Sequence, residues 1–170
     1  IAYETVTADD GSMPLLAPMS TIAGQLAFFV GSYHLLKHNN GKGVMIGKLE
    51  DIDPRVVSVI GAGVAGTQSI AKALENHAHV KVVDSSQQKL ESLKSQFGTN
   101  NIEYILSNEE SIQASINDSD LVIGSVYVVG KEAPRVVTRE MLTSMSPGTV
   151  MVDVSIDQGG CFESSRPTTH

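Results

Sequence analysis

The sequence has a single cysteine, no long hydrophobic run and no concentrated patch of positive charge. With only Cys161 present, no disulfide can form within the chain, which suits a reducing compartment such as the cytoplasm. No apolar stretch approaches the roughly 20 residues of a membrane-spanning helix, and no signal-peptide pattern is visible. The net charge is −7 and the charges are scattered. We therefore expect a cytoplasmic protein that binds neither nucleic acid nor membrane.

The chain also lacks an initiating methionine, internal repeats and low-complexity segments. It begins at Ile1 within what reads as a strand or linker, and it ends in a polar stretch without a capping signal. We therefore expect a fragment of a longer polypeptide. With 170 residues and 41% hydrophobic content, the chain is long and apolar enough for one domain with its own core.

The most informative feature present is segment 56–66, in which a β-branched run leads directly into a GxGxxG motif. Gly61 permits a tight turn out of a strand, Gly63 has no Cβ to obstruct a pyrophosphate, and Gly66 lets the next helix pack closely. The phosphates would lie at the N-terminus of that helix, where free N–H groups and the helix dipole favour anions. A second apolar run follows and ends on an acid. This order is typical of a dinucleotide-binding site.

The acid at the end of the second run is Asp84, whose carboxylate can accept hydrogen bonds from both hydroxyls of an adenosine ribose. A 2′-phosphate at this position would be repelled. The next residues, Ser85 and Ser86, offer no arginine to neutralise one. The sequence therefore predicts NAD rather than NADP. Lys89 either reaches the ribose or adenine edge or is a solvated lysine, and its spacing favours the second interpretation.

Short apolar strands alternate with amphipathic helical patterns along most of the chain. Strands are predicted at 56–60, 80–84, 102–106, 121–125 and 150–154, and helices at 63–77, 87–97, 109–117 and 138–145. Such alternation is typical of an α/β fold with a doubly wound parallel sheet of the Rossmann type and right-handed crossovers.

The N-terminal part of the chain has a different pattern. Residues 1–6 are predicted to be extended and are followed by a turn-rich linker. Ser20 is a good N-cap for a long helix that runs to about His38, and Asn39-Asn40-Gly41 would end it. We divide the chain into an interdomain strand and linker at 1–19 and a nucleotide-binding domain at 20–170.

In a sheet of this kind, ligands bind beyond the carboxyl ends of the strands. This rule selects the glycine turn, Asp84, Ser107, and segments 125–127 and 155–157. Asp157 is followed by Gly159-Gly160, where the backbone could approach a flat ring closely. Its carboxylate would then face the reactive end of the cofactor. Position alone favours the plainer interpretation of an acid that caps a loop.

Four motifs together resemble the alanine dehydrogenases, which share a family with the pyridine nucleotide transhydrogenases. They are LLAPMS at 15–20, GKGV at 41–44, the glycine fingerprint, and VDVSIDQGG at 152–160. The resemblance covers essentially the whole chain, including Arg-Pro-Thr-Thr at 166–169. The IDQGG run is the most discriminating motif, because transhydrogenases usually have an alanine-rich, asparagine-containing run there.

The resemblance implies roles for individual residues. Asp157 would be the catalytic acid at the nicotinamide end, working with a histidine from another domain. The implied cofactor contacts are Ser20 with a phosphate, the Val64 and Ala65 N–H groups with the pyrophosphate, Asp84 and Lys89 with the adenosine ribose, Ser107 with the adenine, and Ser125, Val126 and Val136 along the path to the nicotinamide.

The resemblance also implies an activity and partners. Alanine dehydrogenases oxidise L-alanine to pyruvate and ammonia with NAD, and they form hexamers built from dimers. Their substrate-holding groups lie in a second domain that has no match in this sequence. We therefore expect this chain to bind NAD, to form a homo-oligomer, with the first helix as a dimer contact, and not to turn over L-alanine alone. His34 and His38 have metal-ligand spacing, but no third ligand is identifiable, so no metal site is predicted.

Three alternatives remain open on the sequence. The chain could be the NAD(H)-binding domain of a proton-translocating transhydrogenase, against which IDQGG argues. It could be a non-catalytic nucleotide-sensing module, which would leave the first helix and Asp157 unexplained. It could also be a methyltransferase, which binding of S-adenosylmethionine in place of NAD would reveal.

Overall fold

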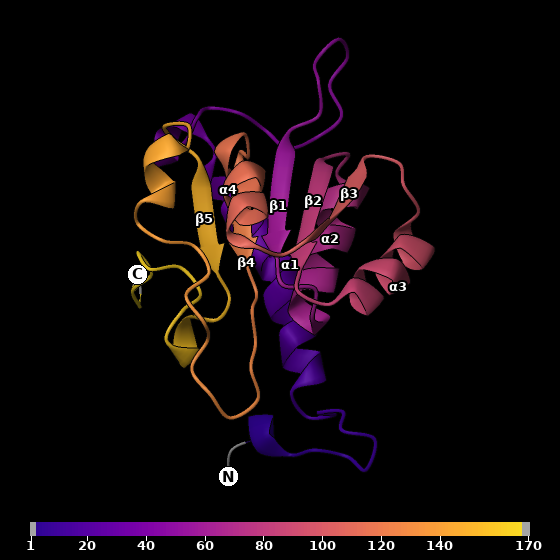
Figure 1. The fold of residues 1–170 in the computed structure, drawn as a ribbon. Helices are drawn as coiled ribbons and strands as arrows, with labels where there is room; N and C mark the ends of the chain where they lie inside the picture. The colour runs from indigo at the N-terminus through magenta and orange to yellow at the C-terminus, as the bar shows by residue number, and fades with distance from the viewer. Residues whose placement is uncertain (1–2, 168–170) are drawn as a thin grey trace.

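The computed structural model describes residues 3–167 and shows a parallel sheet with helices on both faces (Figure 1). The strands are β1 (Val56–Ile60), β2 (His79–Asp84), β3 (Ile102–Leu106), β4 (Leu121–Gly124) and β5 (Val150–Asp153), in the spatial order β3-β2-β1-β4-β5. The helices are α1 (Ala17–His34), α2 (Val64–Glu75), α3 (Gln87–Phe97) and α4 (Glu109–Asn117). The expected α/β, doubly wound fold is therefore confirmed, and most element ends agree with the sequence prediction within two residues.

The central strands β2, β1 and β4 are buried on both faces, as in most parallel sheets, whereas the edge strands β3 and β5 are more exposed. In β1, Val57 and Val59 belong to the apolar cluster under α1, α2 and α3, whereas Ile60 belongs to the cluster on the α4 side. Ser58 faces α4 as well, and its hydroxyl lies 2.9 Å from the Ser115 carbonyl oxygen, so this buried polar group is satisfied. The alternation along β1 thus assigns α1, α2 and α3 to one layer and α4 to the other.

Helix α1 packs in the same layer as α2 through two glycines. An added Cβ at Gly24 would overlap the Ala65 carbonyl oxygen, and one at Gly31 would overlap the Leu121 side chain. Both glycines are buried. The absence of side chains therefore lets the α1 backbone lie against α2 and the sheet.

The start of α1 differs from the prediction. Its N-cap is Leu16, Pro18 lies in the first turn, and Ser20 falls inside the helix with its N–H donating to the Leu16 carbonyl at 2.9 Å. Proline is tolerated in a first turn because the N–H groups there have no helical partner, so the helix begins before the serine. The predicted Ser20 cap is wrong for this reason.

Two further predictions near the N-terminus are corrected. Tyr3–Thr5 forms a 3₁₀ turn rather than an extended strand, and Ile1 and Ala2 lie outside the described residues. Helix α1 ends at His34, and Lys37–Asn39 forms a separate 3₁₀ turn. The chain then folds back on the end of α1: the Gly43 N–H donates to the Leu35 carbonyl at 2.8 Å, and Gly41 lies so close to the His34 and Leu35 carbonyls that a Cβ would clash.

The predicted helix at 138–145 is also wrong, because only Met141–Ser144 forms a 3₁₀ helix. The Thr138 hydroxyl does accept the Met141 N–H at 3.3 Å, as a cap would. Pro147 and Gly148 follow almost at once and lead into β5, so the chain has no room for further turns.

The GKGV segment lies at the amino ends of the strands, opposite the glycine turn. Lys42 Nζ is 2.9 Å from Asp120 Oδ1, and Asp120 Oδ2 accepts the Val56 N–H at 3.1 Å. This motif therefore joins the loop after α1 to the starts of β1 and β4, which is a structural role.

Within the described residues 3–167, no helix is both long enough and apolar enough to cross a membrane.

Candidate functional site

The turn between β1 and α2 has the backbone geometry that its glycines predict. Gly61 has a φ of 97°, and a Cβ there would lie 2.7 Å from the Ser125 carbonyl oxygen. A Cβ at Gly66 would overlap the Gly61 carbonyl oxygen. A Cβ at Gly63 would meet nothing within 4 Å, so this glycine faces open space. Two glycines are thus required by close backbone packing, and the third leaves the turn accessible to a ligand.

Helix α2 starts at this turn without a side-chain cap, because its N-cap is Gly63. The other two helices of the βα units are capped by their own sequence. Ser86 Oγ accepts the Lys89 N–H at 3.3 Å, and Asn108 forms a capping box with Ser111. The first N–H groups of α2, including those of Val64 and Ala65, therefore suit an external anion.

Asp84 ends β2 beside the turn and is only 7% exposed. Its Oδ2 accepts the Ala62 N–H at 2.7 Å, and its Oδ1 accepts the Ser86 N–H at 2.8 Å. The sequence predicted that this carboxylate faces a ribose. Its second role, the hydrogen bond that holds the glycine turn, was not predicted. Since a carboxylate has about four lone-pair sites, Asp84 keeps acceptor capacity after these two bonds.

Two predicted serines lie next to these groups. The Ser107 N–H donates to the Asp84 carbonyl at 2.9 Å, which places Ser107 beside the acid at the end of β3. The Ser125 hydroxyl is directed at the turn itself and donates to the Gly61 carbonyl at 2.7 Å. Ser125 is 6% exposed, so in this structure it supports the turn backbone from the β4 side.

Asp157 lies in the 3₁₀ turn Ile156–Gln158 after β5, and its side chain is exposed. Gly159 and Gly160 have φ values of 93° and 79°, so the chain reverses direction directly after it. The reversal brings the backbone back toward the end of β5, where Asp153 lies.

The Asp153 carboxylate closes this loop. It accepts N–H groups from Ser155 at 3.0 Å, Cys161 at 2.9 Å and Phe162 at 3.2 Å, and it also accepts the Ser165 hydroxyl. Sequence reasoning missed Asp153. The available signal was an acid at the end of an apolar strand, the same signal that identified Asp84.

The Asp157 loop is tied to the segments that hold the remaining predicted residues. The Ser155 hydroxyl donates to the Val126 carbonyl at 2.7 Å, and the Val136 N–H donates to the Cys161 carbonyl at 2.8 Å. Burial and the neighbouring Asp153 charge raise the pKa of Cys161 to about 12. This thiol is therefore protonated at neutral pH and has a structural environment.

Ser20 and Lys89 are less closely connected to the turn. Ser20 is half-buried in the first turn of α1, and Figure 1 shows this end of α1 extending beyond the carboxyl edge of the sheet. Lys89 is exposed on α3, and its backbone N–H donates to Ser86. The structure thus brings Asp84, Ser107 and Ser125 together around the glycine turn and leaves the Lys89 side chain in solvent.

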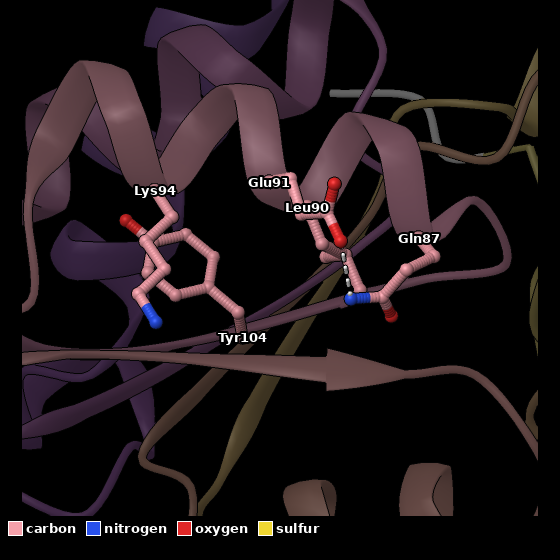
Figure 2. A pocket seen from close by; sticks show the side chains of 5 residues that line it. All are labelled: Gln87, Leu90, Glu91, Lys94 and Tyr104. Atoms are coloured by element: carbon pink, nitrogen blue, oxygen red, sulfur yellow. Dashed lines mark hydrogen bonds between the residues drawn. The ribbon is translucent and has the colours of Figure 1, made fainter.

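A hollow of about 230 Å³ lies elsewhere, between α3 and the edge strand β3 (Figure 2). Its lining includes Gln87, Glu91 and Tyr104. Gln87 Nε2 donates to Glu91 Oε1 at 3.2 Å, and the Tyr104 hydroxyl donates to the Gly98 carbonyl at 2.8 Å. These polar groups already have partners, and none of the predicted site residues lines the hollow, so it is not the candidate site.

The sheet order, the glycine turn at the switch from β1 to β4 and the acid at the end of β2 define a Rossmann-type fold of the dinucleotide-binding class. The family model for the C-terminal domain of alanine dehydrogenase/PNT matches residues 27–170. The chain therefore belongs to the alanine dehydrogenase/PNT family.

Individual relatives agree with this assignment. The chain is 45% identical to alanine dehydrogenase of Halomonas elongata, covering all of this chain and 46% of that protein. It is 46% identical to alanine dehydrogenase of Mycobacterium tuberculosis H37Rv, with the same coverage. The chain thus spans about half the length of the curated relatives it matches.

Solved structures extend the comparison. An L-alanine dehydrogenase superposes with a TM-score of 0.95 at 39% identity, covering all of this chain and 47% of that one. A transhydrogenase from Sinorhizobium meliloti superposes with a TM-score of 0.75 at 30% identity, covering 89% of this chain and 43% of that one. A dipicolinate synthase chain from Bacillus halodurans shares the fold at 18% identity, with a TM-score of 0.63, covering 86% of this chain and 43% of that one.

Proposed function

We propose that this chain is the NAD-binding domain of an enzyme that oxidises L-alanine to pyruvate and ammonia. The observation that carries the proposal is the uncapped glycine turn, held by Asp84 and opening at Gly63 to free space. The similarity to alanine dehydrogenases over the whole chain supports L-alanine as the substrate of the proposed enzyme. Because the chain spans about half of those relatives, we assign the remaining substrate contacts to segments outside it.

The adenosine end of NAD would lie across the ends of β2 and β3. Asp84 has acceptor sites left for the ribose hydroxyls, and Ser107 is hydrogen-bonded to its backbone. Lys89, on the next helix, has a long exposed side chain that can reach the same region. A 2′-phosphate would meet the Asp84 charge, which favours NAD over NADP.

The pyrophosphate would lie at the start of α2. The Val64 and Ala65 N–H groups supply donors there, the three glycines of the turn permit the approach, and Ser20 would reach the phosphates from α1. The nicotinamide would then extend along Ser125, Val126 and Val136 toward the Asp157 loop, which is hydrogen-bonded to the segments that hold these residues.

When bound, NAD would supply the hydride acceptor for the oxidation of L-alanine at its Cα. The chain's own contribution is to orient the dinucleotide and to present an ionisable group beside its nicotinamide end. Asp157 is exposed on a loop that Asp153 closes, so its carboxyl group can exchange a proton with a group from the other domain. We propose that the isolated chain binds NAD and does not turn over L-alanine.

Calorimetric titration with NAD and NADP tests the cofactor assignment. The unmodified chain is expected to bind NAD and not NADP, and Asp84→Ala to bind NAD at least about tenfold more weakly, since it loses a charge-assisted contact. Asp118→Ala is the matched control, because Asp118 is an exposed acid paired with Lys81 and lies just before the amino end of β4. The assignment would be contradicted if the chain bound NAD and NADP equally well, or if it bound neither nucleotide.

A second candidate function is the NAD(H)-binding domain of a transhydrogenase, favoured by the structural similarity to that class. The non-catalytic sensing module predicts the same binding result. Alanine-dependent NADH formation by the full-length parent protein distinguishes alanine dehydrogenase from both. Loss of that activity in Asp157→Asn, with NAD affinity unchanged, would support the role of Asp157.

We also propose that the chain forms a homodimer through α1. The outward face of this helix has large exposed apolar side chains at alternating spacings of three and four residues, the pattern of a helix-to-helix seam: Met19, Ile22, Leu26, Phe29 and Tyr33. Light scattering should show a dimer that Leu26→Glu converts to a monomer, whereas Gln88→Glu on α3 leaves it intact. The proposal would be contradicted if the unmodified 170-residue chain were a monomer.

A further inference from the structure

Helix α1 contacts the phosphate-binding turn although it lies far from the GxGxxG motif in sequence. A Cβ at Gly24 would overlap the Ala65 carbonyl oxygen and lie 2.7 Å from its carbonyl carbon and 2.9 Å from its Cα. These are backbone atoms, so no rotation of a side chain can relieve the contact. A side chain at position 24 would therefore have to push the first turn of α2 away from α1.

A buried serine joins the same two backbones. Ser69 is fully buried, and its hydroxyl donates to the Gly24 carbonyl at 2.7 Å, with the Ala65 carbonyl oxygen 3.2 Å away as a weaker second acceptor. The adjacent side chains add a second link, since Gln25 Nε2 donates to Gln68 Oε1 at 3.2 Å. Helix α1 is thus fixed to the N-terminal half of α2 by hydrogen bonds.

The two sides of the turn are consequently set by different parts of the chain. The Ser125 hydroxyl holds the Gly61 carbonyl from the β4 side, and Gly24 together with Ser69 fixes Ala65 from the α1 side. The Ala65 N–H points along the axis of α2 toward its open N-terminus, so a shift of this residue changes the direction in which its N–H group is presented.

We propose that Gly24 and Ser69 are positioning residues that place the first N–H groups of α2 for the pyrophosphate of the dinucleotide. This inference rests on the proposed function, because it concerns the same ligand. It assigns part of the phosphate specificity of the site to a helix outside the sequence fingerprint.

The experiment compares Gly24→Ala with Gly31→Ala. Both substitutions add one methyl group to a buried glycine on the same helix, but Gly31 faces the Leu121 side chain, away from the turn. Affinity for NAD and ADP-ribose is measured by calorimetry, affinity for adenosine by NMR titration, and stability by thermal melting. Gly24→Ala should weaken NAD and ADP-ribose about tenfold or more while adenosine binding is unchanged.

The expected control result is that Gly31→Ala lowers the melting temperature and leaves all three affinities unchanged. Ser69→Ala serves as a second variant that introduces no steric overlap, and it should show the same selective loss in smaller measure. Unchanged NAD affinity in both Gly24→Ala and Ser69→Ala would overturn the inference. So would a loss that affects adenosine equally, or an equal loss in Gly31→Ala.

Failure of the unmodified chain to bind NAD would instead overturn the proposed function, and this inference with it. Binding of NAD by the unmodified chain therefore distinguishes a failure of this inference from a failure of the proposed function.

Discussion

Two carboxylates end strands at the same edge of the sheet, and each accepts hydrogen bonds from backbone N–H groups. Asp84, at the end of β2, accepts one N–H on each oxygen. Asp153, at the end of β5, accepts three N–H groups, the Ser165 hydroxyl and the Cys161 thiol. A carboxylate has about four lone-pair sites, so Asp153 is saturated by its own loop and Asp84 is not.

The difference in acceptor capacity distinguishes the proposed ribose-binding group, Asp84, from a structural group, Asp153. Asp84 holds the glycine turn and retains acceptor sites for a ribose, so we expect its loss to affect both the turn and binding of the proposed ligand. Asp153 directs all of its capacity at residues 155–165, so its loss should affect the loop that contains Asp157. Three measurements sharpen this distinction, taken from the largest expected effect to the smallest.

Asp153→Asn should lower the free energy of unfolding by about 3 kcal/mol, because the new amide group faces N–H donors that remain partly buried and unpaired. Urea denaturation measures the loss. Asp157→Asn is the matched control in the same loop, and it should change stability by less than about 0.5 kcal/mol because Asp157 is exposed. Equal effects of the two substitutions would remove the structural role of Asp153.

Asp84→Asn should reduce the preference for NAD over NADP by about tenfold, because it removes the charge that repels a 2′-phosphate. Calorimetry with both nucleotides gives the ratio of affinities. Asp118→Asn removes the same charge at an exposed position and should leave the ratio unchanged. A ratio that falls as much in Asp153→Asn would show that the two carboxylates do not differ in function.

The smallest effect, over the measured range of pH 8 to 10, concerns Cys161, whose pKa is raised from 9.0 to about 12 by burial and by the Asp153 charge. The folded state therefore holds the thiol proton more tightly than the unfolded state. This contribution to stability is complete below pH 9 and is lost as the pH rises from 9 toward 12, by at most about 1.4 kcal/mol per pH unit. Urea denaturation of the parent chain and Cys161→Ala at pH 8, 9 and 10 measures it. Parallel pH dependences in the two proteins would contradict the raised pKa.

The sequence predicted the core of the fold well because its signals there are local. The β-branched run at 56–60 and the helices at 87–97 and 109–117 have the predicted bounds, and α3 and α4 are capped by Ser86 and Asn108. The predicted ends of α1 and the predicted helix at 138–145 were wrong, because prolines and close backbone packing determine where these elements begin and end.

The sequence predicted one end of the candidate site, around the glycine turn, in more detail than the other end, around Asp157. The glycine turn and Asp84 follow from spacing, since each residue type has a specific steric or electrostatic task. The role of Asp157 stays a prediction that depends on resemblance, because an exposed acid after a strand has no distinguishing pattern. The bond of Asp84 to the glycine turn and the bonds of Asp153 to its loop depend on how these loops fold back onto the strand ends. No local sequence pattern predicts that arrangement.

Helix α1 has one face against the glycine turn and an apolar stripe, Met19 to Tyr33, on the opposite face. A shift of α1 that follows from a contact on the apolar stripe would also move the α2 backbone, since Gly24 lies directly against Ala65 and Ser69 bonds to Gly24. Any molecule that packs on the stripe and prefers one position of α1 alters the free energy of presenting the Ala65 N–H. Thermodynamic reciprocity then requires the dinucleotide to alter that molecule's affinity by the same factor.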